Sequence, residues 1–134
     1  MLDLATHRSG LPRMPANFAP KDPFNPYVDY PAERLYEFLS SHELRRDVGA
    51  EYEYSNLGSG LLALALARRA GTDFETALRD RVFRPLGMSS TGIRLTPALQ
   101  SGMAPPHSSA FHVAPVLEYR RHRPPCPQSE GVGR

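Results

Sequence analysis

The chain has 134 residues, a formal net charge of +2, and 40% hydrophobic and 22% charged residues. This length suits about one domain, and so small a charge argues against nucleic acid as a partner. The most apolar stretch, residues 57–67, is shorter than the roughly 20 residues that span a bilayer. The first residues also lack the features of a signal peptide. We therefore expect no membrane partner, and the cytoplasm is the default location of a chain whose localisation is otherwise unknown.

Cysteine and histidine give no metal signal. Cys126 is the only cysteine, which excludes an internal disulfide. The spacing of His107, His112 and His122 from Cys126 matches no standard zinc pattern. We predict no metal and no cofactor, and we interpret the basic run at residues 120–123 as solvated.

Two helices and a long loop are expected in the first third of the chain. Residues 2–7 resemble the last turns of a helix, which Gly10 and Pro12 end. Six prolines between residues 12 and 31 predict a long loop. The next helix begins at Pro31 and ends near Ser41 or His42. Its apolar residues, which recur at helical spacing, are Leu35, Phe38 and Leu39.

The middle of the chain predicts a buried helix after a short extended segment. Residues 51–54 alternate polar and aromatic side chains, so Tyr52 and Tyr54 should point the same way. Ser55 or Asn56 is the expected N-cap. Residues 57–67 are apolar nearly all round, which predicts a central, buried helix that Gly71 ends. We expect the glycines at positions 58 and 60 to admit another backbone.

A further helix is expected after residue 72, and the amino-acid composition changes further along the chain. Thr72 and Glu75 have the spacing of a capping box, and Pro85 ends the helix, with a loop at 86–92. Residues 104–134 hold six of the fourteen prolines and show no period, so we predict a disordered tail. We predict that this tail, after about Met103, is a frameshifted reading of GC-rich DNA; the alternative is a natural disordered segment.

Three segments resemble a known family. Residues 6–12 read THRSGLP, residues 49–58 read GAEYEYSNLG, and residues 83–91 read FRPLGMSST. They resemble, in order and at plausible spacing, segments of the serine β-lactamase-like and penicillin-binding-protein-like family, which includes class C β-lactamases and esterases. Val48 stands where proline is common. The motifs extend over about residues 2–103.

The resemblance implies one of the three catalytic elements of that family, which are Ser-x-x-Lys, Tyr-x-Asn and a Lys-Thr-Gly-type strand. Tyr54 and Asn56 match the second element, with Ser55 at its variable middle position. The other two are absent from the sequence, because the only lysine, Lys21, has Phe18 three residues before it.

The resemblance also implies what these residues do. The residue matching Tyr54 takes or relays the proton of the nucleophilic serine, together with the lysine. The residue matching Asn56 exchanges hydrogen bonds with the substrate amide and the lysine; its use as a helix cap is a compatible alternative. We expect His7 to be structural and Ser9 to be a turn residue.

The complete family fold has a sheet flanked by helices and a helical lobe. We therefore expect a mainly α fragment, with three or four helices, in which residues 1–103 form a partial β-lactamase-like domain and residues 104–134 a disordered tail. The expected function is that of a fragment, inactive alone, of a hydrolase that cleaves a small acyl substrate (lactam, peptide or ester) through an acyl-serine. The alternative is a non-enzymatic small helical interaction module.

Overall fold

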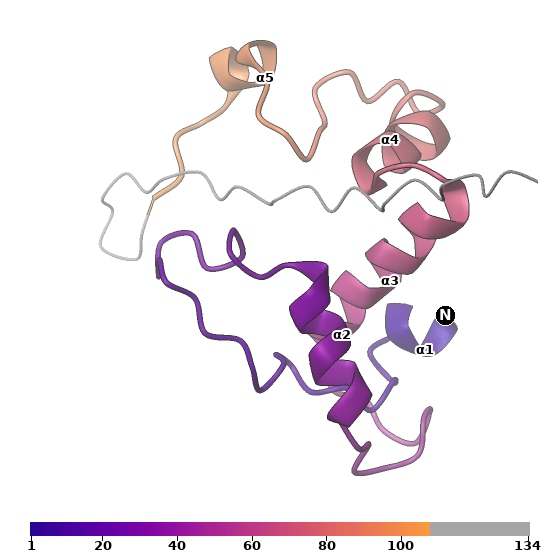
Figure 1. Ribbon diagram of the computed structural model, residues 1–134. Coiled ribbons are helices and arrows are strands. Elements are labelled where there is room, and N and C mark those ends of the chain that lie inside the picture. The colour runs from indigo at the N-terminus through magenta and orange to yellow at the C-terminus, as the bar shows by residue number, and fades with distance from the viewer. Residues whose placement is uncertain (108–134) are drawn as a thin grey trace, which may run out of the picture.

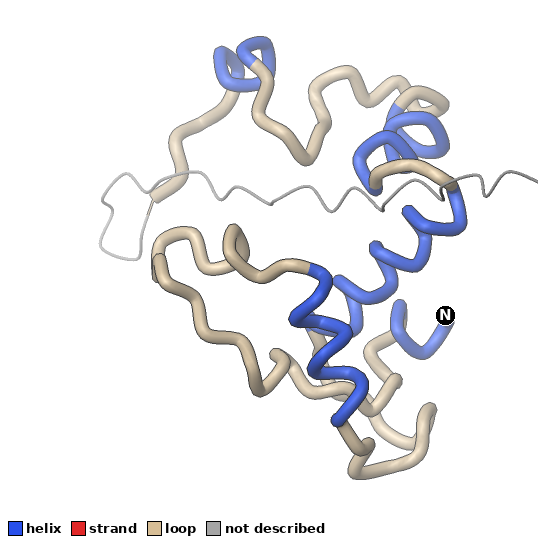
Figure 2. Tube along the Cα trace, viewed as in Figure 1, coloured by secondary structure: helices blue, strands red, loops and turns tan. Residues whose placement is uncertain are grey.

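All regular secondary structure in the described part of the chain is helical. The computed structural model describes residues 1–107, which form helices and loops and no β-strand (Figures 1 and 2). The elements are α1 (Leu2–Ala5), α2 (Ala32–Ser41), α3 (Asn56–Ala70), α4 (Phe74–Leu78), the π-helical turn η1 (Arg79–Phe83) and α5 (Pro97–Gly102). The expected mainly α fold is thus confirmed. Most of the expected tail, residues 108–134, lies outside the described part of the chain.

Helix α3 is the central element. Helices α1 and α4 contact it directly, and Figure 1 shows α2 crossing near its N-terminal half. Leu35 and Phe38 of α2 join Leu11 and Leu57 in one small buried cluster, with Leu61 and other side chains packed around it. The apolar stripe predicted for α2 therefore faces the core.

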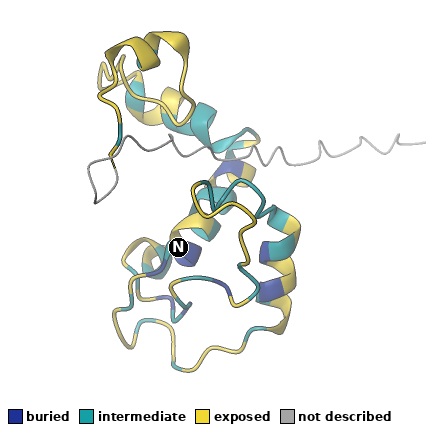
Figure 3. Cartoon of the chain, turned by 90° about the vertical axis from the view of Figure 1, so that its left-hand side faces the viewer, coloured by how far each residue is buried: buried dark blue, intermediate teal, exposed yellow. Residues whose placement is uncertain are grey.

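The burial predicted for α3 is wrong over much of the helix. Within it only Leu57, Gly58 and Ala67 are buried, and Leu66 is 40% exposed. Figure 3 shows the buried residues gathered in the lower part of the molecule. The reason is that the described neighbours of α3 cover only part of its surface. A helix with leucine and alanine on all sides is therefore left partly uncovered.

The loop between α1 and α2 has no regular structure, as its prolines predict, yet it is tied to α2. The Tyr30 hydroxyl donates to Asn17 Oδ1 (2.8 Å), and Asn17 Nδ2 donates to the Arg34 carbonyl (2.8 Å). The Arg34 guanidinium donates in return to the Asn17 carbonyl. Burial raises the pKa of Tyr30, although the Arg34 charge opposes that shift. The loop thus has a defined path next to the core.

The cap of α4 differs from the expected capping box. Asp73, and not Thr72, is the N-cap, and its carboxylate accepts from the Thr76 backbone N–H (3.1 Å) and hydroxyl (2.9 Å). Glu75 instead accepts from the Arg94 backbone N–H (3.2 Å) and pairs with its guanidinium (3.1 Å). Aspartate is as good a cap as threonine or better, and the ion pair with a distant loop uses the carboxylate that the box would need.

Helix α5 was not predicted, although its signals are present. Thr96 is the N-cap and accepts from the Leu99 backbone N–H (3.2 Å), with Pro97 in the first turn. A capping residue followed by proline is a common helix start. The six residues that follow lack an apolar period long enough to indicate a helix.

We predict that Asp73→Ala lowers the free energy of unfolding by about 1 kcal/mol, because it removes the N-cap. Thr72→Ala is the matched control and should change that free energy by less than about 0.5 kcal/mol. Urea unfolding of both variants measures the difference. Equal losses of free energy of unfolding in the two variants would contradict Asp73 as the N-cap and support the capping box expected from the sequence.

The same cap should make stability depend on pH. The Thr76 amide holds the pKa of Asp73 below its usual value. A lowered folded-state pKa stabilises the fold above the ordinary aspartate value of about 3.9, and that stabilisation disappears as pH falls through the lower folded value. Asparagine at position 73 can cap the helix but cannot titrate. The difference in free energy of unfolding between the wild type and Asp73→Asn should therefore become smaller as the pH is lowered from 6 to 3. A difference in free energy of unfolding that becomes larger over this pH range would contradict the prediction.

We also predict marginal stability for the isolated chain, because large apolar side chains such as Leu86 (70% exposed) and Leu66 remain accessible. Binding of a hydrophobic dye and a broad thermal transition are the expected results. A sharp two-state melt of a monomer that binds no such dye would contradict it.

Candidate active site

The predicted site begins where an extended segment enters α3. Ser55 is the N-cap of this helix and its side chain is completely buried (0% exposed). Its Oγ donates to the Pro12 carbonyl (2.7 Å) and accepts from the Gly58 backbone N–H (2.8 Å). One hydroxyl therefore both caps the helix and fastens it to the loop that follows α1. Of the two expected caps, Ser55 fills the role and Asn56 is the first helical residue.

Backbone hydrogen bonds continue this junction on both sides of Ser55. The N–H groups of Asn56 and Leu57 donate to the Arg13 carbonyl (3.1 and 3.2 Å). The Glu53 N–H donates to the His7 carbonyl (2.8 Å). The first N–H groups of a helix have no partner within the helix, so the loop supplies what the start of α3 lacks. Residues 7–13 and 53–58 thus form one hydrogen-bonded unit.

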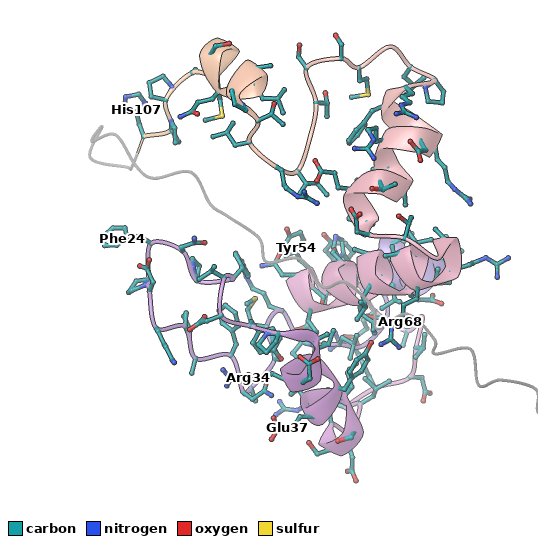
Figure 4. The ribbon with its side chains drawn as sticks, turned by 45° about the horizontal axis from the view of Figure 1, so that its top comes forward. Phe24, Arg34, Glu37, Tyr54, Arg68 and His107 are labelled. Carbon is teal, nitrogen blue, oxygen red and sulfur yellow. The ribbon has the colours of Figure 1, made fainter. Side chains whose placement is uncertain are left out.

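Tyr54 presents its ring at the surface of this unit. It is 48% exposed, and Figure 4 shows it at the start of α3. The ring centroid lies 4.6 Å from that of His7, and the Arg13 guanidinium carbon lies 5.6 Å from the centroid, within cation–π range. Tyr52 also contacts the His7 ring, at 5.9 Å. Both tyrosines therefore lie beside the same imidazole, as their alternation predicts.

Asn56 lines a groove, and Tyr54 is not part of its lining. This open groove of about 560 Å³ lies between the loop 14–31, α2, α3 and residues 73–75 and 93–94. The Asn56 Nδ2 lies 3.6 Å from Met14 Sδ, a weak acceptor. The amide therefore has capacity for a stronger partner, and it borders the groove where a small molecule could meet it.

The glycine after the motif has a clear steric reason. A Cβ on Gly58 would lie 3.2 Å from Ser55 Oγ and 3.5 Å from Ser9 Oγ. The glycine thus leaves room for two hydroxyls, whereas the sequence suggested a neighbouring backbone. A Cβ on Gly60 would meet no other atom within 4 Å among the described residues outside the adjacent helix backbone, so the expected close approach is wrong there. Ser9 is buried and its Oγ accepts from the Leu11 N–H (3.4 Å), which confirms a turn residue.

One further anchor of this region, Arg46, was not predicted from the sequence. The Arg46 guanidinium pairs with Glu53 and lies 3.9 Å from Glu51. This pairing ties the loop after α2 to the segment that leads into Tyr54. Its Nε is buried without a hydrogen-bond partner, which is a cost that the paired nitrogens offset.

Metal-ligating side chains do not cluster in this region. Within residues 1–107, no group of three or more His, Cys, Asp or Glu side chains is placed to hold an ion. No helix in the described part of the chain combines the length and apolarity needed to cross a membrane.

Comparison with known proteins gives a consistent picture. The family model described as Beta-lactamase matches residues 1–126, which extends beyond the motifs that end near residue 103. The D-alanyl-D-alanine-carboxypeptidase/endopeptidase AmpH of Escherichia coli is 36% identical over 91 residues, covering 68% of this chain and 23% of AmpH. The chain thus spans about a quarter of the length of this curated relative.

Solved structures agree with the sequence comparisons. A β-lactamase/D-alanine carboxypeptidase from Yersinia pestis superposes with a TM-score of 0.64 and 34% identity, over 73% of this chain and 27% of that protein. A class C β-lactamase superposes with a TM-score of 0.69 over 86% of this chain and 30% of its own, at 22% identity, which supports the fold alone.

We predict that Ser55→Ala destabilises the chain by about 2–3 kcal/mol, because it removes the cap and leaves the partly buried Pro12 carbonyl without its donor. The control is Ser59→Ala. The Ser59 hydroxyl is on an exposed residue and donates only to the Ser55 carbonyl (3.1 Å), so its loss should cost less than about 0.5 kcal/mol. Similar losses in denaturant melts of the two variants would show that the buried hydroxyl is not the link between the loop and α3.

Proposed function

The chain belongs to the Beta-lactamase family, and from this premise we propose that Tyr54 and Asn56 are the Tyr-x-Asn element of an acyl-serine hydrolase. The substrates of such an enzyme would be small acyl compounds with a lactam, peptide or ester bond. The observation that carries the proposal is the placement of the two residues. Tyr54 is exposed at a tightly hydrogen-bonded helix start, and Asn56, two residues further on, borders the groove.

The proposed role of Tyr54 is proton transfer. A serine hydroxyl is a weak nucleophile and needs a base beside it. The deprotonated form of an exposed tyrosine on an ordered backbone, the phenolate, can accept that proton, and the phenol so formed can return it to the leaving group. Three hydrogen bonds fix residues 53, 55 and 56 and so restrict the position of the Tyr54 backbone. Such orientation of a reacting group is a large part of catalysis.

The proposed role of Asn56 is to orient substrate. Its amide offers both a donor and an acceptor. Its described contact, to the Met14 sulfur, is weak. A substrate amide or an ammonium group would therefore be a stronger partner than the one that it now has.

The isolated chain should have no hydrolase turnover, because its sequence contains no Ser-x-x-Lys. Loss of a nucleophile costs several orders of magnitude in rate. Nitrocefin and p-nitrophenyl ester assays, together with a fluorophosphonate probe, measure this. Labelling of a serine in this chain, with hydrolysis lost when that serine is mutated, would overturn the prediction.

A chimera tests the proposed roles directly. Residues 1–107 would replace the matching segment of the Yersinia pestis protein, which is 34% identical. Tyr54→Phe in the chimera should lower kcat by about 10²–10⁴-fold, and Tyr52→Phe is the matched control at a neighbouring exposed tyrosine. A folded, active chimera in which Tyr54→Phe retains full activity would refute the role of Tyr54.

The second candidate function is a non-enzymatic interaction module. The groove favours it, because its lining comprises mostly apolar side chains from five parts of the chain, among them Leu35, Leu64 and Phe74. Ala63→Glu places a charge on the groove and away from Tyr54. If the segment is an interaction module, Ala63→Glu in the chimera should abolish binding of its partner, and Tyr54→Phe should leave that binding unchanged. If it is the Tyr-x-Asn element of a hydrolase, Tyr54→Phe should lower the rate of hydrolysis.

A further inference from the structure

His7 has an unusual backbone conformation for its residue type. Its φ is 58°, which makes it the one non-glycine residue with positive φ among residues 1–107. Residues with a Cβ enter this left-handed region at a cost of about 1–2 kcal/mol. The conformation therefore persists only where other contacts of the same residue offset it.

Three contacts of His7 converge on the segment around Tyr54. Its carbonyl accepts the Glu53 N–H (2.8 Å), and its Nδ1 accepts the Ser55 N–H (3.2 Å). Its ring lies 4.6 Å from the Tyr54 ring, centroid to centroid. The residue before Tyr54, the residue after it and its own side chain are thus all held by one histidine.

The positive φ explains how one residue makes these contacts. The next residue turns back, and the Arg8 N–H donates to the Asp3 carbonyl (2.7 Å) while the Arg8 carbonyl accepts the Gly49 N–H (2.8 Å). This turn leaves both the His7 carbonyl and its imidazole directed at residues 53–55.

We propose that His7 is the positioning residue of Tyr54. Its imidazole is neutral, with the proton on Nε2, because Nδ1 must have a free lone pair to accept the Ser55 N–H. The role of the positioned phenol rests on the proposed function, but the contacts that do the positioning do not. Loss of the imidazole frees the Ser55 amide and lets the Tyr54 ring move.

Three substitutions separate the hydrogen bond from the backbone conformation. Asparagine tolerates the left-handed region, and its Oδ1 can replace Nδ1 as the acceptor. Glycine also adopts this conformation without strain but has no acceptor. The side-chain amide of glutamine lies at the position of histidine Nε2, and not at the position of Nδ1. If positioning depends on Nδ1, only His7→Asn should restore the contact to Ser55.

Amide hydrogen exchange of residues 53–57 in the full chain is the first measurement. The Ser55 amide should exchange about five- to tenfold faster in His7→Gly and His7→Gln, the change expected for one lost hydrogen bond. In His7→Asn it should stay within about threefold of wild type. His42→Asn is the control, since His42 stacks on Phe38 elsewhere in the fold. Unchanged exchange in His7→Gly would overturn the proposal.

NMR of the wild-type chain is the second measurement, and it needs no variant to fold. Long-range ¹H–¹⁵N spectra at pH 8 should show the His7 proton on Nε2, and nuclear Overhauser effects should connect the His7 and Tyr54 rings. A proton on Nδ1, or rings without such contacts, would refute the proposal. Neither readout involves hydrolysis, so failure of the proposed function would leave both results unchanged.

Discussion

The hydroxyl of Ser55 is the interaction on which the described fold depends. It is fully buried and bridges the Pro12 carbonyl and the Gly58 N–H. Burial of a polar group is costly unless both its donor and its acceptor find partners, and here both do. The bridge fixes the loop that follows α1 against the N-terminus of α3. The path of the chain on either side then follows from this junction.

The junction also separates the two residues of the motif. Tyr54 belongs to the extended entry and lies at the surface with His7, whereas Asn56 is the first residue of α3 and borders the groove. The backbone changes from extended to helical at Ser55, between these two residues. The motif thus carries an exposed side chain and a groove-lining side chain on either side of a single anchored residue.

The apolar surface of α3 sets a second constraint. One part of the helix packs on α1, on α4 and on the cluster around Leu35 and Phe38, while other leucines such as Leu66 remain exposed. This chain spans about a quarter of the length of its curated relative AmpH. The partly uncovered surface of α3 and the presence of one of the family's motifs accompany this limited span.

The sequence by itself determined the local features: α2 between proline and histidine, α3 with its glycine stop, the long loop, and the motif at Tyr54 and Asn56. These follow from residues within a few positions of one another, through backbone preference and helical period. Tertiary structure decided the rest. Ser55 and Pro12 are 43 residues apart, His7 and Ser55 are 48 apart, and Glu75 and Arg94 are 19 apart. The partner of a hydrogen bond over such separations leaves no periodic trace, so only the folded chain could show that the variable middle residue of the motif anchors it.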